Sequence, residues 1–184
     1  PASRLHMLPP GIAKDRCASE DAPARRSMAR EQLNAGVDEH LLLFVGSGFV
    51  KKGLGRALCA VAAARVSSPR SAVRLLVVGQ DKDARYRRLA KRLGIQEQVQ
   101  FLGGRDDIPE LLLAADTLIH PALDEAAGIV LLEALVAGLP VVVTDVCGYA
   151  HHIASSGGGR VLASPFSQPA LDEALQASLG AEWR

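Results

Sequence analysis

The sequence lacks the features that mark nucleic-acid-binding, disulfide-rich and membrane-spanning proteins. Its 184 residues carry a net charge of only +1, which provides no global field to attract nucleic acid. The three cysteines, Cys17, Cys59 and Cys147, are odd in number and widely spaced, which argues against a disulfide framework and a zinc site. No run approaches the roughly 18 apolar residues of a membrane-spanning helix, and the first residues do not resemble a signal peptide. We therefore expect a cytoplasmic protein that does not bind nucleic acid.

Length and composition fit one globular domain. Apolar residues make up 48% of the chain and charged residues 22%, which is typical of a protein with a closed hydrophobic core. The first ten residues are rich in proline and have the character of an interdomain linker. We expect residues 1–20 to form a linker and the start of the domain, residues 21–184 to form the domain itself, and the chain to be a fragment.

Short apolar runs alternate with segments of helical composition along the whole chain. Because the runs are apolar throughout, they indicate strands buried on both faces, as in a parallel sheet covered by helices. The predicted fold class is α/β, a Rossmann-like doubly wound parallel sheet, whose ligands bind beyond the carboxyl ends of the strands. The predicted strands are residues 40–46, 72–79, 99–102, 117–120, 140–144 and 161–163, and the predicted helices are 22–35, 54–66, 81–93, 108–115, 128–137 and 168–179.

Two glutamates lie on either side of a predicted helix start. If the helix begins near Gly128, Glu125 lies just outside its amino end and Glu133 lies more than one turn inside it. The free backbone N–H groups and the dipole of a helix start suit a phosphate, while ionised glutamates accept hydrogen bonds from hydroxyls. The alternative is that both are ordinary solvated acids, but the neighbours of Glu133 are apolar, where a carboxylate needs hydrogen-bond partners. The pattern favours a nucleotide sugar.

A glycine-rich loop, residues 46–53, joins the first predicted strand to the next helix. Its spacing excludes a dinucleotide fingerprint, because Lys51 stands where the third glycine would be, and it excludes a Walker loop, because Leu54 follows Gly53. Lys52 could reach a diphosphate from this loop, and Arg16 could form a fork to phosphate oxygens. The alternatives are an ordinary β–α turn with solvated lysines and a surface arginine.

The remaining charged segments allow further interpretations. His151 and His152 are neighbours that cannot easily share one metal ion, and His120 could simply cap the sheet, so no metal site is expected. The predicted helix 81–93 carries six basic residues, which could attract an anionic membrane surface or could form a solvated face.

Several motifs together resemble the carboxyl-terminal half of glycosyltransferase family 4 enzymes, and within them those that add glucose to the lipopolysaccharide core. The resemblance covers almost the whole chain and rests on Pro-Pro-Gly-Ile, Lys-Lys-Gly, Val-Val-Gly-Gln-Asp, Phe-Leu-Gly-Gly-Arg-Asp-Asp, His-Pro-Ala, Glu-Ala-Ala-Gly-Ile-Val-Leu-Leu-Glu-Ala, Gly-Leu-Pro-Val-Val-Val-Thr and Val-Cys-Gly-Tyr-Ala-His-His-Ile-Ala.

The resemblance implies the donor-binding half of a GT-B enzyme. Such an enzyme transfers glucose from UDP-glucose to an inner-core heptose with retention and without a metal, peripherally on the cytoplasmic face of the inner membrane. It implies that Glu125 contacts the hexose, that Glu133 holds the ribose, and that Arg105 lies near uracil. Arg16 and Lys52 would contact the pyrophosphate and, with Glu125, form the catalytic set. The donor cradle would be completed by Gly46, Ser47, Gly48, Ala126, Ala127, Gly128, Ile129 and Val130.

Other functions stay open at this point. A family 4 enzyme with another donor sugar or acceptor, or a non-catalytic nucleotide-binding module, would share the same motifs. A nicotinamide-dependent oxidoreductase is disfavoured by the interrupted glycine fingerprint. The resemblance also places the acceptor on an amino-terminal domain that this chain does not contain, so we expect the chain alone to be inactive.

Overall fold

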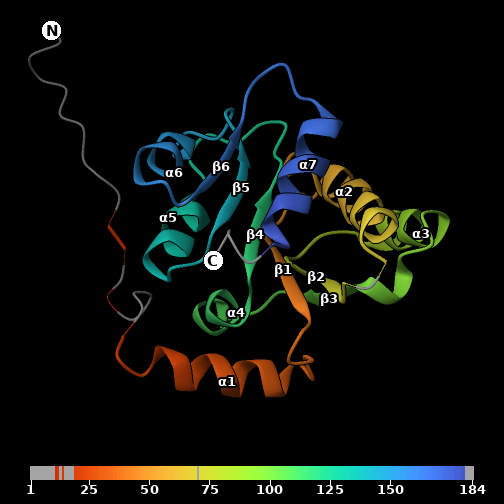
Figure 1. Cartoon of the computed structure of the whole chain (residues 1–184). Coiled ribbons are helices and arrows are strands. Elements are labelled where there is room, and N and C mark those ends of the chain that lie inside the picture. Colours follow the sequence, from red (N-terminus) through yellow and green to blue (C-terminus); the bar gives the residue numbers. More distant parts are fainter. Residues whose placement is uncertain (1–10, 13, 15–18, 70, 181–184) are drawn as a thin grey trace, which may run out of the picture.

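The computed structural model describes residues 11–12, 14, 19–69 and 71–180, which form a sheet covered by helices (Figure 1). The predicted doubly wound α/β fold is confirmed by six parallel strands in the order β3-β2-β1-β4-β5-β6. The strands are β1 (His40–Val45), β2 (Val73–Val78), β3 (Val99–Gly103), β4 (Thr117–His120), β5 (Val141–Thr144) and β6 (Gly159–Leu162).

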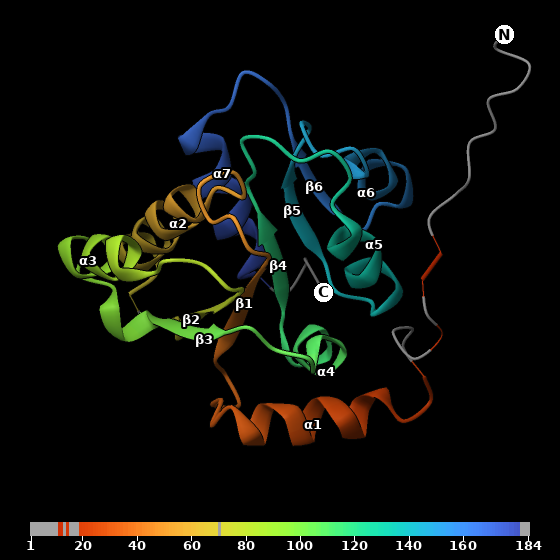
Figure 2. The same ribbon diagram turned by 180° about the vertical axis from the view of Figure 1, so that it is seen from behind.

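Alternate residues of each strand contribute to two separate cores. Leu42 and Phe44 of β1 pack under α2, α3 and α7, whereas Leu41 and Leu43 pack under α4, α5 and α6. Figures 1 and 2 show these two groups of helices on opposite faces of the sheet. The helices are α1 (Ala22–Gln32), α2 (Leu54–Ser67), α3 (Ala84–Arg92), α4 (Ile108–Ala114), α5 (Ile129–Val136), α6 (Ala150–Ser156) and α7 (Gln168–Ser178), and a 3-10 helix, η3, covers Gln96–Gln98.

The direction of winding changes between β1 and β4. After β1 the chain adds β2 and β3 on one side, and it then returns to place β4, β5 and β6 on the other side of β1. The loops that leave β1 and β4 therefore lead to helices on opposite faces of the sheet, and sheets of this kind bind ligands beyond the carboxyl ends of the strands at such a point. The fold thus brings the loops 46–53 and 121–128 to the place where such sheets bind ligands.

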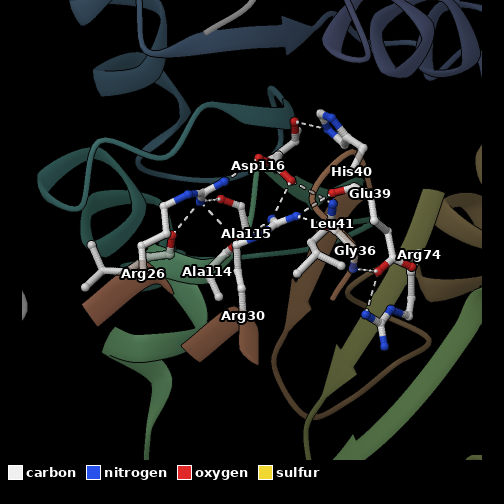
Figure 3. Close-up of polar contacts among 12 residues, drawn as sticks. Arg26, Arg30, Gly36, Glu39, His40, Leu41, Arg74, Ala114, Ala115 and Asp116 are labelled. Carbon is white, nitrogen blue, oxygen red and sulfur yellow. Dashed lines mark hydrogen bonds and ion pairs between the residues drawn. The ribbon is translucent and has the colours of Figure 1, made fainter. Parts of the chain in front are cut away.

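A network of charged side chains lies at the amino ends of the strands, where α1 lies below the sheet (Figures 1 and 3). Arg26 donates to the carbonyls of residues 113–115 at the end of α4 and to Asp116, and Arg30 forms a second ion pair with the same carboxylate. The N–H of Leu41 also donates to Asp116 at 2.8 Å. Burial disfavours ionisation of Asp116, but the hydrogen bonds from Leu41 and Arg26 hold its pKa below the ordinary value. This network attaches α1 to the sheet.

Three predicted boundaries are wrong by more than one residue, and one helix is missing from the prediction. α1 ends at Gln32 rather than residue 35. α3 begins at Ala84 rather than residue 81, because the Asp81 carboxylate accepts backbone hydrogen bonds from Phe49 and Lys82 instead of entering the helix. β6 begins two residues earlier than predicted, at Gly159. The helix α6 was not predicted as an element, since its seven residues bury only Ala150 and Ile153 and so show almost no periodicity. None of the described helices is long and apolar enough to cross a membrane.

Candidate functional site

The glycine-rich loop after β1 is tied to the end of β2. The N–H of Gly46 donates to the carbonyl of Val78 at 2.9 Å, and the hydroxyl oxygen of Ser47 accepts from the N–H of Gln80 at 3.0 Å. Gly46 lies under the stem of Lys52, so that a Cβ at position 46 would come within 3.3 Å of the Lys52 Cε. Gly48 has open space around it. These contacts direct Lys52 out of the loop and across the carboxyl end of the sheet.

Gly53 brings this loop against the loop that follows β4. Its φ of 77° lies in the left-handed region, and a Cβ there would come within 1.9 Å of the Pro121 carbonyl oxygen. The N–H of Leu123 donates to the Lys51 carbonyl at 2.7 Å. Only glycine permits so close an approach, and the two loops on either side of the switch point therefore act as one structural unit.

The segment of Glu125 to Ala127 is held on its other side by the turn before α6. The N–H groups of Gly148 and Tyr149 donate to the carbonyls of Glu125 and Ala127, at 3.2 and 2.9 Å. Glu125 also forms an isolated parallel bridge with Cys147, whose buried thiol has a raised pKa. The N–H of Ala127 donates to Oε1 of Glu125 at 3.5 Å, so the segment is bonded through its carbonyls on one side and through this N–H on the other.

Helix α5 begins at Ile129, within one residue of the prediction. As at any helix start, the first amides, Ile129 and Val130, have no helical carbonyl to bind. No side chain caps the helix at Gly128 to replace these carbonyls. The side chain of Glu125 lies against this start, since its Cγ would be 3.4 Å from a Cβ on Gly128. An uncapped helix start offers N–H donors and a positive dipole end to an anion.

Glu133 lies on α5 one turn after Ile129 and is half-buried. Side chains on a helix point back toward its amino end, over the residues three and four positions earlier. Glu133 thus belongs to the first turns of the helix whose start Glu125 contacts. That the two acids bind one ligand there, with contacts to ribose and hexose, stays a prediction.

Lys52 and Glu125 form an ion pair at the centre of this junction. Both side chains are largely buried, with 23% and 11% of their surface exposed. Burial lowers the pKa of the Lys52 ammonium, and the carboxylate of Asp124 acts in the opposite direction. The site thus holds a cation and a carboxylate in direct contact, and both have little access to water.

His120 is a third member of this cluster, and the sequence interpretation of it as a cap on the sheet missed this position. It ends β4, its side chain is fully buried, and its Nε2 lies 3.6 Å from Oε2 of Glu125. Burial and the nearby charge of Lys52 lower the pKa of His120 to about 4. The sequence signal was available, since a histidine that ends an apolar strand five residues before Glu125 must face either the core or the site.

The other predicted residues lie apart from this cluster or outside the described part. Arg105 follows β3, two strands from β1, and its exposed guanidinium pairs with Asp107, which raises the Arg105 pKa. The contact of Arg105 with uracil stays a prediction. Arg16 and most of the predicted linker lie outside the described residues. Within the described residues, no three His, Cys, Asp or Glu side chains are grouped so as to hold a metal ion.

Comparison with known proteins decides the family of this site. The family model described as glycosyl transferases group 1 matches residues 26–180, which include the two loops and α5. The chain belongs to the group 1 glycosyltransferases. Among curated members of this family, lipopolysaccharide glucosyltransferase WaaG of Escherichia coli K12 is 49% identical over 176 residues, which cover 96% of this chain and 47% of WaaG. A D-inositol 3-phosphate glycosyltransferase of Salinispora arenicola is 32% identical over 79% of this chain and 35% of its own.

Two solved structures share the fold. The crystal structure of WaaG, described as a glycosyltransferase involved in lipopolysaccharide biosynthesis, aligns with a TM-score of 0.91 and 48% identity over 96% of this chain and 48% of that one. The structure of Anabaena HepE in complex with UDP and glucose aligns with a TM-score of 0.78 and 25% identity over 94% of this chain and 46% of that one. This chain therefore spans about half the length of the relatives it matches.

Proposed function

We propose that the chain is the donor-binding half of a retaining glucosyltransferase that transfers glucose from UDP-glucose to a heptose of the lipopolysaccharide inner core. One observation carries the donor assignment. Lys52, Glu125 and the uncapped start of α5 meet at the switch point of the sheet. The names of WaaG and of the HepE complex support glucose as the sugar, UDP as the nucleotide and lipopolysaccharide as the pathway.

Each group at the junction suits one part of UDP-glucose. The ammonium of Lys52 and the N–H groups at the start of α5 bind the diphosphate, with Arg16 as a further cation. Glu125, outside the helix, accepts hydrogen bonds from hexose hydroxyls, and Glu133, one turn inside it, accepts them from the ribose. Along UDP-glucose, groups that donate hydrogen bonds to phosphate thus alternate with carboxylates that accept hydrogen bonds from sugar hydroxyls.

The same groups account for catalysis. Departure of UDP builds negative charge on the β-phosphate, where Lys52 and the α5 amides are directed. Interactions that strengthen as this charge develops stabilise the transition state more than the bound donor and so raise the rate. We propose that these cationic and dipolar groups replace a metal ion. Chelation with EDTA then leaves the affinity for UDP-glucose unchanged, whereas a metal-dependent site loses affinity.

Calorimetric titration tests the donor assignment directly. The unmodified chain binds UDP-glucose, and Glu133→Ala weakens binding by about 10- to 150-fold, because each hydrogen bond to a charged group contributes about 1.5–3 kcal/mol. Glu173→Ala, an exposed glutamate on α7, is the matched control and leaves the affinity unchanged. A chain with no affinity for UDP or UDP-glucose would be a non-catalytic module rather than a donor-binding domain.

A donor series tests the sugar and the nucleotide. UDP-galactose and GDP-mannose are titrated beside UDP-glucose, and tighter binding of either would assign another donor. We place the acceptor on the half of the longer relatives that this chain does not span. The chain alone then transfers no radiolabelled glucose to heptose-terminated core, and any transfer would refute this placement.

We further propose peripheral contact with the cytoplasmic face of the inner membrane through α3. Lys82 before this helix and five basic residues on it, Arg85, Arg87, Arg88, Lys91 and Arg92, are exposed, while Tyr86 and Ala90 face the core. Each well-placed cation near an anionic surface contributes about 1 kcal/mol. The chain then floats with vesicles that contain phosphatidylglycerol, and Arg88→Glu with Arg92→Glu abolishes flotation. Equal recovery with neutral vesicles would contradict this contact.

A further inference from the structure

His120 is a buried polar side chain whose hydrogen-bonding capacity is unused. Its side chain is fully buried at the end of β4, and neither ring nitrogen has a hydrogen-bond partner among the described residues. Native proteins satisfy the large majority of buried polar side-chain atoms, so two unsatisfied nitrogens on one ring require an explanation. A histidine with a purely structural role would be expected to bind a backbone carbonyl or a hydroxyl.

The surroundings of the ring direct one nitrogen at the donor site. Its plane is nearly parallel to that of Phe44, at 23° and 6.4 Å between centroids, and this packing fixes its orientation. Nε2 lies 3.6 Å from Oε2 of Glu125, just beyond hydrogen-bonding distance. The same oxygen is the one that Lys52 contacts. Lys52 and His120 therefore approach one carboxylate oxygen from two sides.

The ring is neutral at physiological pH, because burial and the charge of Lys52 lower its pKa to about 4. A neutral imidazole carries one N–H donor and one acceptor nitrogen. With the hydrogen on Nε2, it can donate to a carboxylate without adding a charge to the buried site. A shift of well under 1 Å would close the hydrogen bond to Glu125.

Donor binding creates the need for such a hydrogen bond. In the proposed function, Lys52 contacts the diphosphate, so it must leave the carboxylate of Glu125. Only 11% of the Glu125 side chain is exposed, and its Oε1 already accepts the N–H of Ala127 at 3.5 Å, so Oε2 is the buried oxygen that is costly without a donor. We propose, on the basis of this function, that His120 is a positioning residue that donates Nε2–H to Glu125 when Lys52 turns to the diphosphate.

The release of Lys52 is caused by the diphosphate, which UDP and UDP-glucose share. UDP brings no hydroxyl to Glu125, whereas the hexose of UDP-glucose donates to the same carboxylate in the proposed function. Loss of His120 therefore weakens binding of UDP at least as much as binding of UDP-glucose. A structural role in packing the end of β4 would instead give losses that do not depend on where an amide stands at position 120.

Calorimetry with UDP and UDP-glucose on matched variants tests this inference. His120→Leu keeps an apolar volume but has no donor, and it weakens UDP binding about tenfold and UDP-glucose binding by no more than that. His120→Gln carries an amide that reaches the Nε2 position and restores affinity to within about threefold of the unmodified chain. His120→Asn has the same amide on a shorter side chain and behaves like His120→Leu. The His120→Asn variant also serves if His120→Leu does not fold.

A double-mutant cycle with Glu125→Ala completes the test. Because His120 acts through Glu125, adding His120→Leu to Glu125→Ala causes no further loss of UDP-glucose affinity. Independent, multiplied losses would overturn the inference, as would a loss confined to UDP-glucose or the same affinity for His120→Gln and His120→Asn. Failure of the unmodified chain to bind UDP at all would instead refute the proposed function, so the two results are distinguishable.

Discussion

The buried, neutral state of His120 predicts a pH dependence of stability. Burial and Lys52 lower its pKa from the ordinary 6.5 to about 4 in the folded chain. Between these two values the unfolded chain binds a proton at this position and the folded chain does not. The free energy of unfolding therefore rises with pH across this window, and the contribution of His120 is present above about pH 6.5 and is lost as the pH falls to about 4.

The size of the effect follows from the difference between the two pKa values. Each pH unit between them corresponds to about 1.4 kcal/mol, so the full window amounts to about 3 kcal/mol. A domain of this size has a total stability of about 5–15 kcal/mol. Acidification to pH 4 should therefore remove a substantial part of the stability through this one side chain.

Urea denaturation at intervals between pH 4 and pH 7.5 measures the effect, with His120→Gln as the variant. Other groups titrate in both chains, so their contributions cancel when the two unfolding free energies are subtracted. The advantage of the unmodified chain over the variant should shrink by about 3 kcal/mol from pH 7.5 to pH 4. His151→Gln, at an exposed histidine of α6, is the control for the removal of a histidine from the surface. Parallel curves for His120→Gln and the unmodified chain would refute the reasoning.

Two further predictions concern the packing of the fold. Gly53→Ala should destabilise the chain by more than about 3 kcal/mol in urea denaturation, because its Cβ would meet the Pro121 carbonyl. The control is Gly138→Ala, at a glycine with a similar positive φ but open space around it, which should cost about 1 kcal/mol. Equal costs would mean that the two loops separate readily. Asp116→Asn should lower the free energy of unfolding by about 3–5 kcal/mol, since it leaves Arg26 and Arg30 without their buried carboxylate. An unchanged midpoint for Asp116→Asn would show that the carbonyls around these arginines suffice.

The sheet could be predicted from the sequence because its strands are buried on both faces. A run such as Leu41 to Val45 is apolar at every position, and only a strand between two layers of helices requires this. The helix α6 lacked a comparable signal, as only Ala150 and Ile153 of its seven residues are buried. The start of α3 depended on where the Asp81 carboxylate finds its donors, and Phe49 of a distant loop is one of them. Neither the position of α6 nor the hydrogen bond from Phe49 to Asp81 can be seen in a local sequence pattern.

The candidate site likewise has local features that could be predicted from the sequence and long-range contacts that could not. The position of Glu125 and Glu133 around a helix start follows from their spacing, because both belong to one local segment. The ion pair of Lys52 with Glu125 joins loops after β1 and β4, which are far apart in the sequence and become neighbours only through the strand order. The same holds for His120, whose orientation toward Glu125 depends on how Phe44 of β1 packs against it. The place of these residues in local segments could be predicted, but contacts across the switch point could not.

The ion pair of Lys52 with Glu125 also bears on how the two parts of a donor would bind together. A diphosphate competes for Lys52, and a hexose hydroxyl competes for the carboxylate of Glu125, so each ligand must displace the same contact. Once one has displaced it, the other binds without that cost. By linkage, UDP should therefore raise the affinity for the sugar, and the sugar should raise the affinity for UDP by the same factor. His120 would set the size of this coupling, because the hydrogen bond that it offers decides how readily Glu125 gives up its lysine.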